Sequence, residues 1–181
     1  MAAVLPTKGN LMAAKRSRAL AQTGYELMDR KRNILVREMM ELMDGASALQ
    51  SEIDQVFSEA YAALRQAHIE LGLCDHIAEG VVPDDSLDIR WRSVMGVELP
   101  HIPEHGQQPR PEYSMMYTSP ALDEAYMKFR RVKDMTRRMA EIETSIYRLA
   151  QAIKKSQKRA NALKNIVIPD FDSTIRVISE A

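Results

Sequence analysis

The chain has 181 residues, of which 45% are hydrophobic and 6% aromatic, and its shortage of aromatic residues and glycine favours long helices over sheets. The single cysteine excludes an intramolecular disulfide framework and is typical of an intracellular protein. The formal net charge is zero, but residues 1–40 carry a net charge of +5, residues 41–127 of −12 and residues 128–164 of +9. Charge segregated in this way points to partners and says little about the fold.

Residues 1–80 are predicted to form an N-terminal coiled-coil helix, because apolar residues recur at seven-residue intervals along this segment. One series is Ala14, Ala21, Met28, Leu35, Leu42, Leu49, Val56 and Ala63. An interleaved series runs from Leu11 to Ala67, with only Arg18 and Arg32 as exceptions. Such a helix packs along one narrow seam and would be about 100 Å long.

The two ends of this helix carry sequence signals. Thr7, which follows Pro6, predicts the N-cap. Gly80 followed by Pro83 predicts the end, and Gly72 is either a weak point inside the helix or an earlier end.

Residues 81–118 are predicted to form a proline-rich head, because five of the eight prolines fall in this segment. Within it, the alternating pattern of LDIRWRSVMGVELPHI predicts two short strands, about 87–93 and 97–102. The turn between them is expected near Met95-Gly96.

Residues 119–181 are predicted to form the second coiled-coil helix. Ser119 predicts its N-cap, and Pro120 suits its first turn. Its apolar series is Val132, Met135, Met139, Ile142, Ile146, Leu149, Ile153, Ser156, Ala160 and Leu163, in which only the serine is polar. A seven-residue repeat of this kind predicts a left-handed supercoil.

A proline lies inside this second helical pattern. Pro169 predicts a kink or an interruption near Val167, because a proline removes one hydrogen bond of the helix. Asp170 or Asp172 is then expected to restart the helix.

Two helices with similar seams, joined by a compact head, are expected to fold back on each other. The predicted fold class is all-α dominated, with two long antiparallel helices in a left-handed coiled coil and a short β-hairpin head in the middle. Alignment of the two apolar runs places Leu35 opposite Leu163 and Ala67 opposite Val132.

This register predicts an overhang at the N-terminus. Ala181 would lie opposite Arg18, so that earlier residues would have no partner helix. Either the N-terminal turn protrudes alone or the native chain continues past Ala181. The second is favoured, because the helical pattern carries no stop signal there.

No motif in the sequence points to catalysis or to a bound cofactor. GxxxxGK[ST], GxGxxG, HExxH, GxSxG and CxxC do not occur. His68, Cys74 and His76 do not share one helical face, as a set of metal ligands requires. We therefore expect no catalytic residue, no cofactor and no metal site, and we do not expect an enzyme.

The predicted pair of helices gathers basic residues at its open end. A basic surface of this kind binds nucleic acid, an anionic membrane or an acidic protein, or is a solvated helix face. Nucleic-acid modules usually interleave aromatic residues or glycines with their basic residues, and here only Tyr25 and Tyr147 are near. The residues alone leave the other readings open.

Two stretches at opposite ends of the chain resemble one protein family. RANALKNIVIPDFDSTIRVI (residues 159–178) is similar to the C-terminal segment of the D subunit of V/A-type ATPases, in which R-x-N-A-L and a short apolar run precede I-P and T-I. PTKGNLMAAKRSRALAQTGYELMDRKRNILVREM resembles the opening of the same family, P-T-[KR]-x-x-L followed by G-[YH]-x-L-[LM]-x-x-K-[RQ]. The residues that match are Pro6, Thr7, Lys8, Leu11, Gly24, Tyr25, Leu27, Met28, Lys31 and Arg32, and then Arg159, Asn161, Ala162, Leu163, Ile168, Pro169, Thr174 and Ile175. Two long motifs in the right order are specific, whereas a coiled coil alone is not.

The resemblance implies the central rotor shaft of a V/A-type ATPase or ATP synthase, a non-catalytic component that transmits torque to the membrane ring that translocates ions. Its open end would insert into the hexamer of alternating catalytic and non-catalytic subunits. Its closed end would join the small F subunit of the central stalk and the membrane-side socket subunit, called C or d. One copy would be present per complex, with no nucleic acid bound. The chain would be cytoplasmic and peripheral to the cell membrane, with an indirect membrane association. Family members continue past this C-terminus with a charged helix, which agrees with the overhang expected above.

Under this resemblance, two sets of residues are candidate contacts. The bearing against the hexamer would consist of Arg16, Arg18, Arg30, Lys31, Arg32, Lys154, Lys155, Lys158 and Arg159. The contact of the head with other subunits would consist of Trp91, Met95, Met115 and Met116. A coiled-coil scaffold or adaptor unrelated to ATPases is the main alternative, and the gamma shaft of an F-type synthase shares the architecture but not the end motifs.

Overall fold

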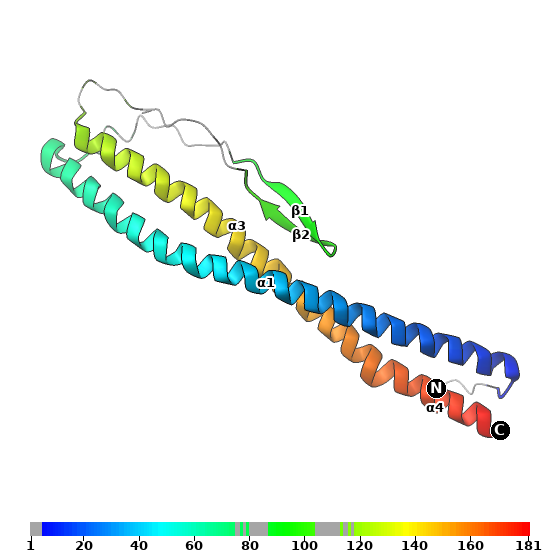
Figure 1. Ribbon diagram of the computed structural model, residues 1–181. Coiled ribbons are helices and arrows are strands. Elements are labelled where there is room, and N and C mark those ends of the chain that lie inside the picture. The colour runs from blue at the N-terminus through cyan, green and yellow to red at the C-terminus, as the bar shows by residue number, and fades with distance from the viewer. Residues whose placement is uncertain are drawn as a thin grey trace. The chain divides into compact units, whose positions relative to one another are not determined.

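The computed structural model describes residues 5–74, 77, 79, 87–103, 113, 116 and 118–181. Its elements are α1 (Lys8–Leu71), β1 (Arg90–Val94), β2 (Val97–His101), α3 (Pro120–Ala162), the π-helix η2 (Leu163–Val167) and α4 (Ile168–Glu180) (Figure 1). The chain is mostly helical, with two long helical segments and a small antiparallel β-hairpin between them, which confirms the predicted fold class. The hand of the supercoil stays a prediction.

The chain divides into two compact units, and both long helical segments contribute to each. Unit 1 consists of Met1–Met39, Val94–Val97 and Arg148–Ala181, and unit 2 consists of Met40–Ser93 and Glu98–Tyr147. In unit 1 the start of α1 lies beside α4, and in unit 2 the second half of α1 lies beside the first half of α3 (Figure 1). Each unit has buried residues of its own.

Helix α1 begins where the sequence predicts. The backbone N–H of Asn10 donates to Thr7 Oγ1 at 3.2 Å, so Thr7 caps the first turn. The helix ends at Leu71, the earlier of the two expected ends, because Gly72 takes a φ of 76°. A glycine adopts this left-handed conformation without strain, and the N–H of Gly72 still donates to the carbonyl oxygen of His68 at 3.0 Å. The later end at Gly80 and Pro83, and with it the boundary between residues 80 and 81, lies outside the described residues.

The hairpin forms around the predicted turn. Met95 and Gly96 both have positive φ, 51° and 75°, as a two-residue turn between right-twisted strands requires. Strand β1 begins at Arg90, three residues later than expected, whereas β2 spans nearly the predicted segment. Leu99 in β2 is completely buried, so this strand carries the packing of the hairpin.

Helix α3 also begins as predicted. Ser119 accepts hydrogen bonds from the backbone N–H of Leu122, at 3.0 Å to its carbonyl oxygen and at 3.4 Å to Oγ. Pro120 occupies the first position of the helix, where its missing N–H costs nothing. The connection that precedes Ser119 in the predicted head lies largely outside the described residues.

The interruption predicted near Val167 is a single π-helical turn. The N–H of Ile168 donates to the carbonyl oxygen of Leu163, five residues earlier. In an α-helix, the ring of Pro169 would collide with the carbonyl of Asn165, and a wider turn relieves this contact. The prediction that an aspartate restarts the helix is wrong, because Val167, at the N-cap of α4, keeps helical angles and no side chain caps this end.

The core of unit 2 consists of two apolar clusters along the helix seam. The first contains Ile53, Val56, Ala60, Val132 and Met135. The second contains Ala67, Cys74, Tyr113 and Leu122, and it anchors residue 113 of the connection to the helices. In unit 1 the buried residues are Ala14, Ala21, Leu35, Leu149, Ser156, Ala160 and Ile178, most of which are small. Small side chains let the two helices approach closely.

The predicted register of the two helices is wrong by about three half-heptads. A Cβ atom added to Gly24 would lie 3.7 Å from Leu163 Cδ1, so Leu163 faces Gly24 and not Leu35. In unit 2, Ala67 clusters with Leu122 and not with Val132. Apolar positions recur every 3.5 residues on average, so a slip of ten or eleven residues still places apolar positions opposite one another. The hydrophobic pattern therefore cannot choose between these registers.

The predicted N-terminal overhang disappears with this correction. Arg18 pairs with Asp172 and not with the last residue, and Asn10 and Ala14 lie near Thr174 and Ile178. The first turns of α1 therefore have a partner helix. Because the N-terminal turn is paired, it gives no reason to expect a longer native chain.

Candidate functional site

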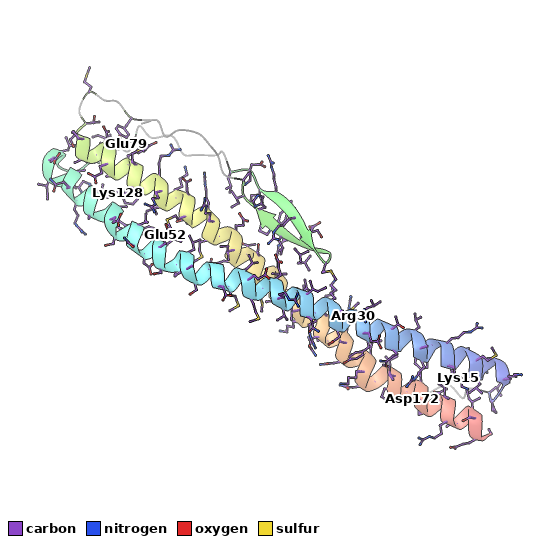
Figure 2. The ribbon with its side chains drawn as sticks, in the orientation of Figure 1. Lys15, Arg30, Glu52, Glu79, Lys128 and Asp172 are labelled. Atoms are coloured by element: carbon purple, nitrogen blue, oxygen red, sulfur yellow. The ribbon has the colours of Figure 1, made fainter. Side chains whose placement is uncertain are left out.

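Unit 1 contains every residue of the predicted bearing. It carries 15 lysines and arginines against 6 aspartates and glutamates, a net charge of +9, and unit 2 carries a net charge of −9. Lys15 and Arg30 extend from the unit 1 part of α1, and Glu52 from the unit 2 part (Figure 2). The charge segregation seen along the sequence is therefore also a segregation between the two compact units.

Most of the predicted bearing residues are exposed. They are Arg16, Arg18, Arg30, Lys154, Lys155, Lys158 and Arg159, whereas Lys31 and Arg32 are half-buried. Exposure leaves long cationic side chains able to reach a partner, and burial of their aliphatic stems would add apolar contact.

Two of these arginines are occupied within unit 1. Arg18 Nε lies 3.0 Å from Asp172 Oδ1. Arg32 pairs with Asp29 at 2.7 Å and donates to Gln157 Oε1, also at 2.7 Å. Both arginines occupy the two exceptions in the heptad series and hold the helix pair together. They are weaker candidates for contact with a partner than the other seven residues.

A further cation outside the predicted bearing, Lys164, also acts within unit 1. Its Nζ lies 5.8 Å from the ring centroid of Tyr25, a distance at which a cation is attracted to an aromatic face. Both residues belong to the stretches that carry the end motifs, but only the correct register brings them together, so the sequence offered no signal for this pair.

Three of the exposed lysines border a shallow depression of about 460 Å³ on α3. Lys154, Lys155 and Lys158 line it together with Gln151 and Ala152. Three ammonium groups on one helix face repel one another and favour an anionic partner.

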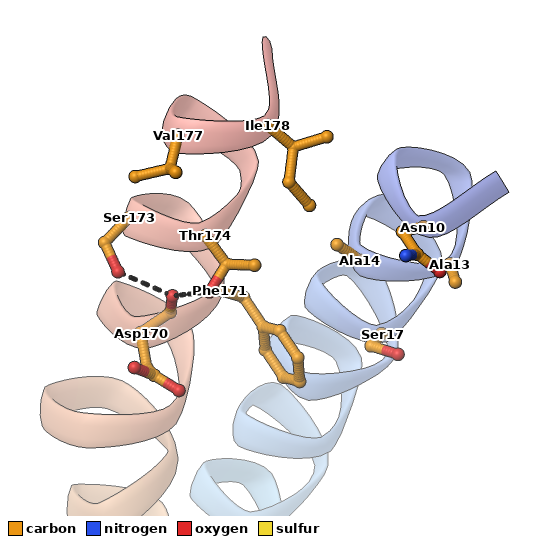
Figure 3. Close-up of a pocket in the computed structure, with 10 residues that line it drawn as sticks. All are labelled: Asn10, Ala13, Ala14, Ser17, Asp170, Phe171, Ser173, Thr174, Val177 and Ile178. Atoms are coloured by element: carbon orange, nitrogen blue, oxygen red, sulfur yellow. Dashed lines mark hydrogen bonds between the residues drawn. The ribbon is translucent and has the colours of Figure 1, made fainter. Parts of the chain in front are cut away.

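A larger cleft, of about 580 Å³, lies in unit 1 between the first turns of α1 and helix α4 (Figure 3). Small residues of α1 line it on one side, and a mixture of polar and apolar residues of α4 lines the other: Asn10, Ala13, Ala14 and Ser17, and then Asp170, Phe171, Ser173, Thr174, Val177 and Ile178. The hydroxyls of Ser173 and Thr174 both donate to the carbonyl oxygen of Asp170, at 2.8 and 2.9 Å. These hydroxyls are therefore satisfied by their own helix, and the cleft pairs no nucleophile with a base.

The predicted head contact is partly described. Trp91, Met95 and Met116 are exposed, with 78% of the Met116 surface accessible, and Met115 lies outside the described residues. The hairpin is tied to α3 within unit 2, where Glu141 accepts the N–H of Ile102 at 2.9 Å and lies 3.1 Å from His101 Nδ1.

One buried phenol stands out among the ionisable groups. Desolvation, reinforced by a 2.6 Å hydrogen bond donated to Asp123 Oδ1, raises the pKa of Tyr113 well above its ordinary value. The ring also packs edge-on against Tyr126. Tyr113 is thus a structural anchor and not a proton donor poised for chemistry.

Within the described ranges, no three histidine, cysteine or acidic side chains come together as metal ligands would. His68 is half-buried and Cys74 is buried, whereas His76 lies outside those ranges. No helix among the described residues has both the length and the apolar character needed to cross a lipid bilayer.

Comparison with known proteins identifies the family. Residues 10–181 match the family model that describes the D subunit of ATP synthase. The V-type ATP synthase D subunit of Thermotoga neapolitana is 40% identical over 179 residues, which cover 98% of this chain and 88% of that protein. The A-type ATP synthase D subunit of Pyrococcus furiosus is 36% identical over 182 residues, which cover 98% of this chain and 85% of that protein. The resemblance inferred from the two end motifs is confirmed: this chain belongs to the family of ATP synthase D subunits of V/A-type ATPases.

Proposed function

We propose that the chain is the central rotor shaft of a V/A-type ATPase. In this role it carries torque between the hexamer that hydrolyses or makes ATP and the membrane ring that translocates ions. It is itself non-catalytic and peripheral to the membrane, present once per complex on the cytoplasmic side. The observation that carries the proposal is the match to the D-subunit family along nearly the whole chain.

The helix pairing supports this role. A shaft must resist twisting, and α1 runs through 64 residues without a break, its seam filled by buried residues in both units. Ion pairs between helices that are far apart in the sequence add to the resistance against twisting. They include Arg18 with Asp172 in unit 1 and Glu52 with Arg131 in unit 2.

The charge distribution supports the proposed arrangement of partners. Under the proposal, the basic surface of unit 1 faces the catalytic and non-catalytic subunits of the hexamer. The acidic unit 2, which contains most of the hairpin, faces the small F subunit and the socket subunit. Distributed charge attracts a partner without one dominant contact, which suits a shaft that must turn.

Reconstitution tests the proposal. The chain is mixed with purified catalytic and non-catalytic subunits, with and without the small F subunit, and the product is weighed by native mass spectrometry. A Ser58→Cys variant, at an exposed position of α1, carries a bead for single-molecule observation, since the native Cys74 is buried. One copy per hexamer, with stepwise rotation on addition of ATP, is the expected result. A stable complex without rotation, or no complex at all, would favour the scaffold alternative.

A further inference from the structure

Three exposed aliphatic side chains follow one line along the unit 1 part of α1. Leu20, Leu27 and Ile34 are seven residues apart, with 74%, 56% and 43% of their surfaces accessible. Seven residues are close to two helical turns, so these side chains lie above one another on the same face. Single exposed leucines are ordinary, but a row of three indicates a contact with a partner. We call these three residues the aliphatic stripe.

A line of arginines runs beside the stripe. Arg16, Arg30 and Arg37 are exposed, and each lies four residues before or three residues after a stripe residue, which makes them neighbours on the helix surface. Among the described residues, no carboxylate pairs with any of these three guanidinium groups. Glu26, an acid on the same side of α1, instead accepts a hydrogen bond from Gln22. This arginine flank is therefore free to meet acidic groups of a partner.

The row of three aliphatic residues with several arginines beside it is confined to unit 1. At the same seven-residue spacing, the series continues in unit 2 as Glu41, Ala48, Gln55, Ala62 and Ile69. The flank continues there as Asp44, Ser51, Ser58 and Arg65, so that an arginine beside an exposed aliphatic residue recurs once, as the isolated pair of Arg65 and Ile69. The aliphatic stripe and the arginine flank end together near Met39, where unit 1 ends on α1, and this suggests one function for both.

We infer that the stripe and its arginine flank form the docking surface for an amphipathic helix that carries an apolar face and a row of Asp or Glu along one edge. Burial of the aliphatic side chains supplies the affinity, and arginine–carboxylate pairs set the orientation of the bound helix. The inference rests on the proposed function, under which this helix belongs to a subunit of the hexamer. The stripe lies on one side of α1, so apolar contact with this helix would be confined to that side.

The first test compares affinities for the hexamer. A triple variant, Leu20→Gln, Leu27→Gln and Ile34→Gln, removes the apolar row and keeps good helix formers. We expect at least about a tenfold loss of affinity, because each buried aliphatic contributes substantially. The matched control is Ile69→Gln, at an exposed position of the same series in unit 2, and it should bind like the wild type. Thermal unfolding followed by circular dichroism verifies that each variant is folded.

The second test identifies the occupant without relying on the triple variant. A photo-reactive amino acid at position 27 of the full chain should cross-link to a helix of the hexamer that carries Asp or Glu along one edge, and the same group at position 69 should not. Reversal of Arg16, Arg30 and Arg37 to Glu should weaken binding most at low ionic strength, where charges are least screened.

The outcomes separate the two proposals. If the wild type binds and the stripe variant binds equally well, or position 27 cross-links elsewhere, the inference is overturned and the shaft proposal stands. If the wild type fails to bind the hexamer, the shaft proposal fails and the inference fails with it.

Discussion

Arg18 and Asp172, 154 residues apart in the sequence, lie side by side in unit 1, with Arg18 Nε 3.0 Å from Asp172 Oδ1. The pair shows which turn of α1 faces which turn of α4. Apolar packing along a heptad seam tolerates slips of half a heptad, whereas a charge pair does not. Arg18 is thus a register marker at one of the two positions where a basic residue interrupts the apolar series.

This pair should contribute modestly to stability. Both side chains are about half exposed, so a double-mutant cycle with Arg18→Ala and Asp172→Ala should give a coupling energy of about 0.5 kcal/mol in urea denaturation. The coupling should shrink at high salt, because exposed charges are screened. A cycle between Arg16→Ala and Asp172→Ala serves as the control. A coupling as large in the control would contradict the assignment of Arg18 as the partner.

Replacement of Pro169 should stabilise the C-terminal helix. Pro169 is exposed, so Pro169→Ala removes little packing and gives residue 169 an N–H that can bond to the carbonyl of Asn165. We expect the free energy of unfolding to rise by about 1 kcal/mol, measured by urea denaturation. Pro120→Ala is the control, because a proline at the first helical position interferes with no bond and its loss should give no gain. An unchanged or lower stability at position 169 would mean that packing, and not the proline, imposes the π-helical turn.

Loss of the Glu141 carboxylate should loosen the hairpin. Glu141→Ala removes the acceptor of the Ile102 N–H and the partner of His101. Amide hydrogen exchange at Ile102, followed by NMR, should become about tenfold faster, which corresponds to one lost hydrogen bond to a charged group. Glu143→Ala, at an exposed position two residues further along α3, should leave this exchange unchanged. Equal effects of the two substitutions would show that the contacts of Glu141 with Ile102 and His101 do not specifically protect the hairpin.

Tyr113 should make the stability depend on pH at the alkaline end. Its pKa is raised in the folded chain above the unfolded value of about 10, so its stabilising effect is complete below pH 10 and is lost as the pH rises beyond it. In a titration of phenolate absorbance, Tyr113 should ionise after the more exposed tyrosines. Tyr113→Phe should flatten the alkaline loss of stability, and Tyr147→Phe, at an exposed position, should not. An early ionisation of Tyr113 would refute the burial of its hydroxyl.

Local signals in the sequence were enough to predict the elements and most of their ends. Thr7 and Ser119 cap the helices that they were expected to cap, and Met95-Gly96 forms the expected turn, because these signals act within a few residues of the chain. Pro169 likewise disturbs the helix where the sequence says it must. The two end motifs identified the family, since each combines several residues in fixed spacing.

The register of the helices and the roles of the basic residues, in contrast, follow from tertiary contacts. Registers that differ by half-heptads bury equivalent apolar positions, so the choice depends on contacts between distant residues, such as Leu163 with Gly24. That choice assigned Arg18 and Arg32 to pairs within unit 1 and left Arg16 and Arg30 exposed. The sequence shows which residues are charged, but whether a charge meets a partner within the chain or outside it depends on how the helices are aligned.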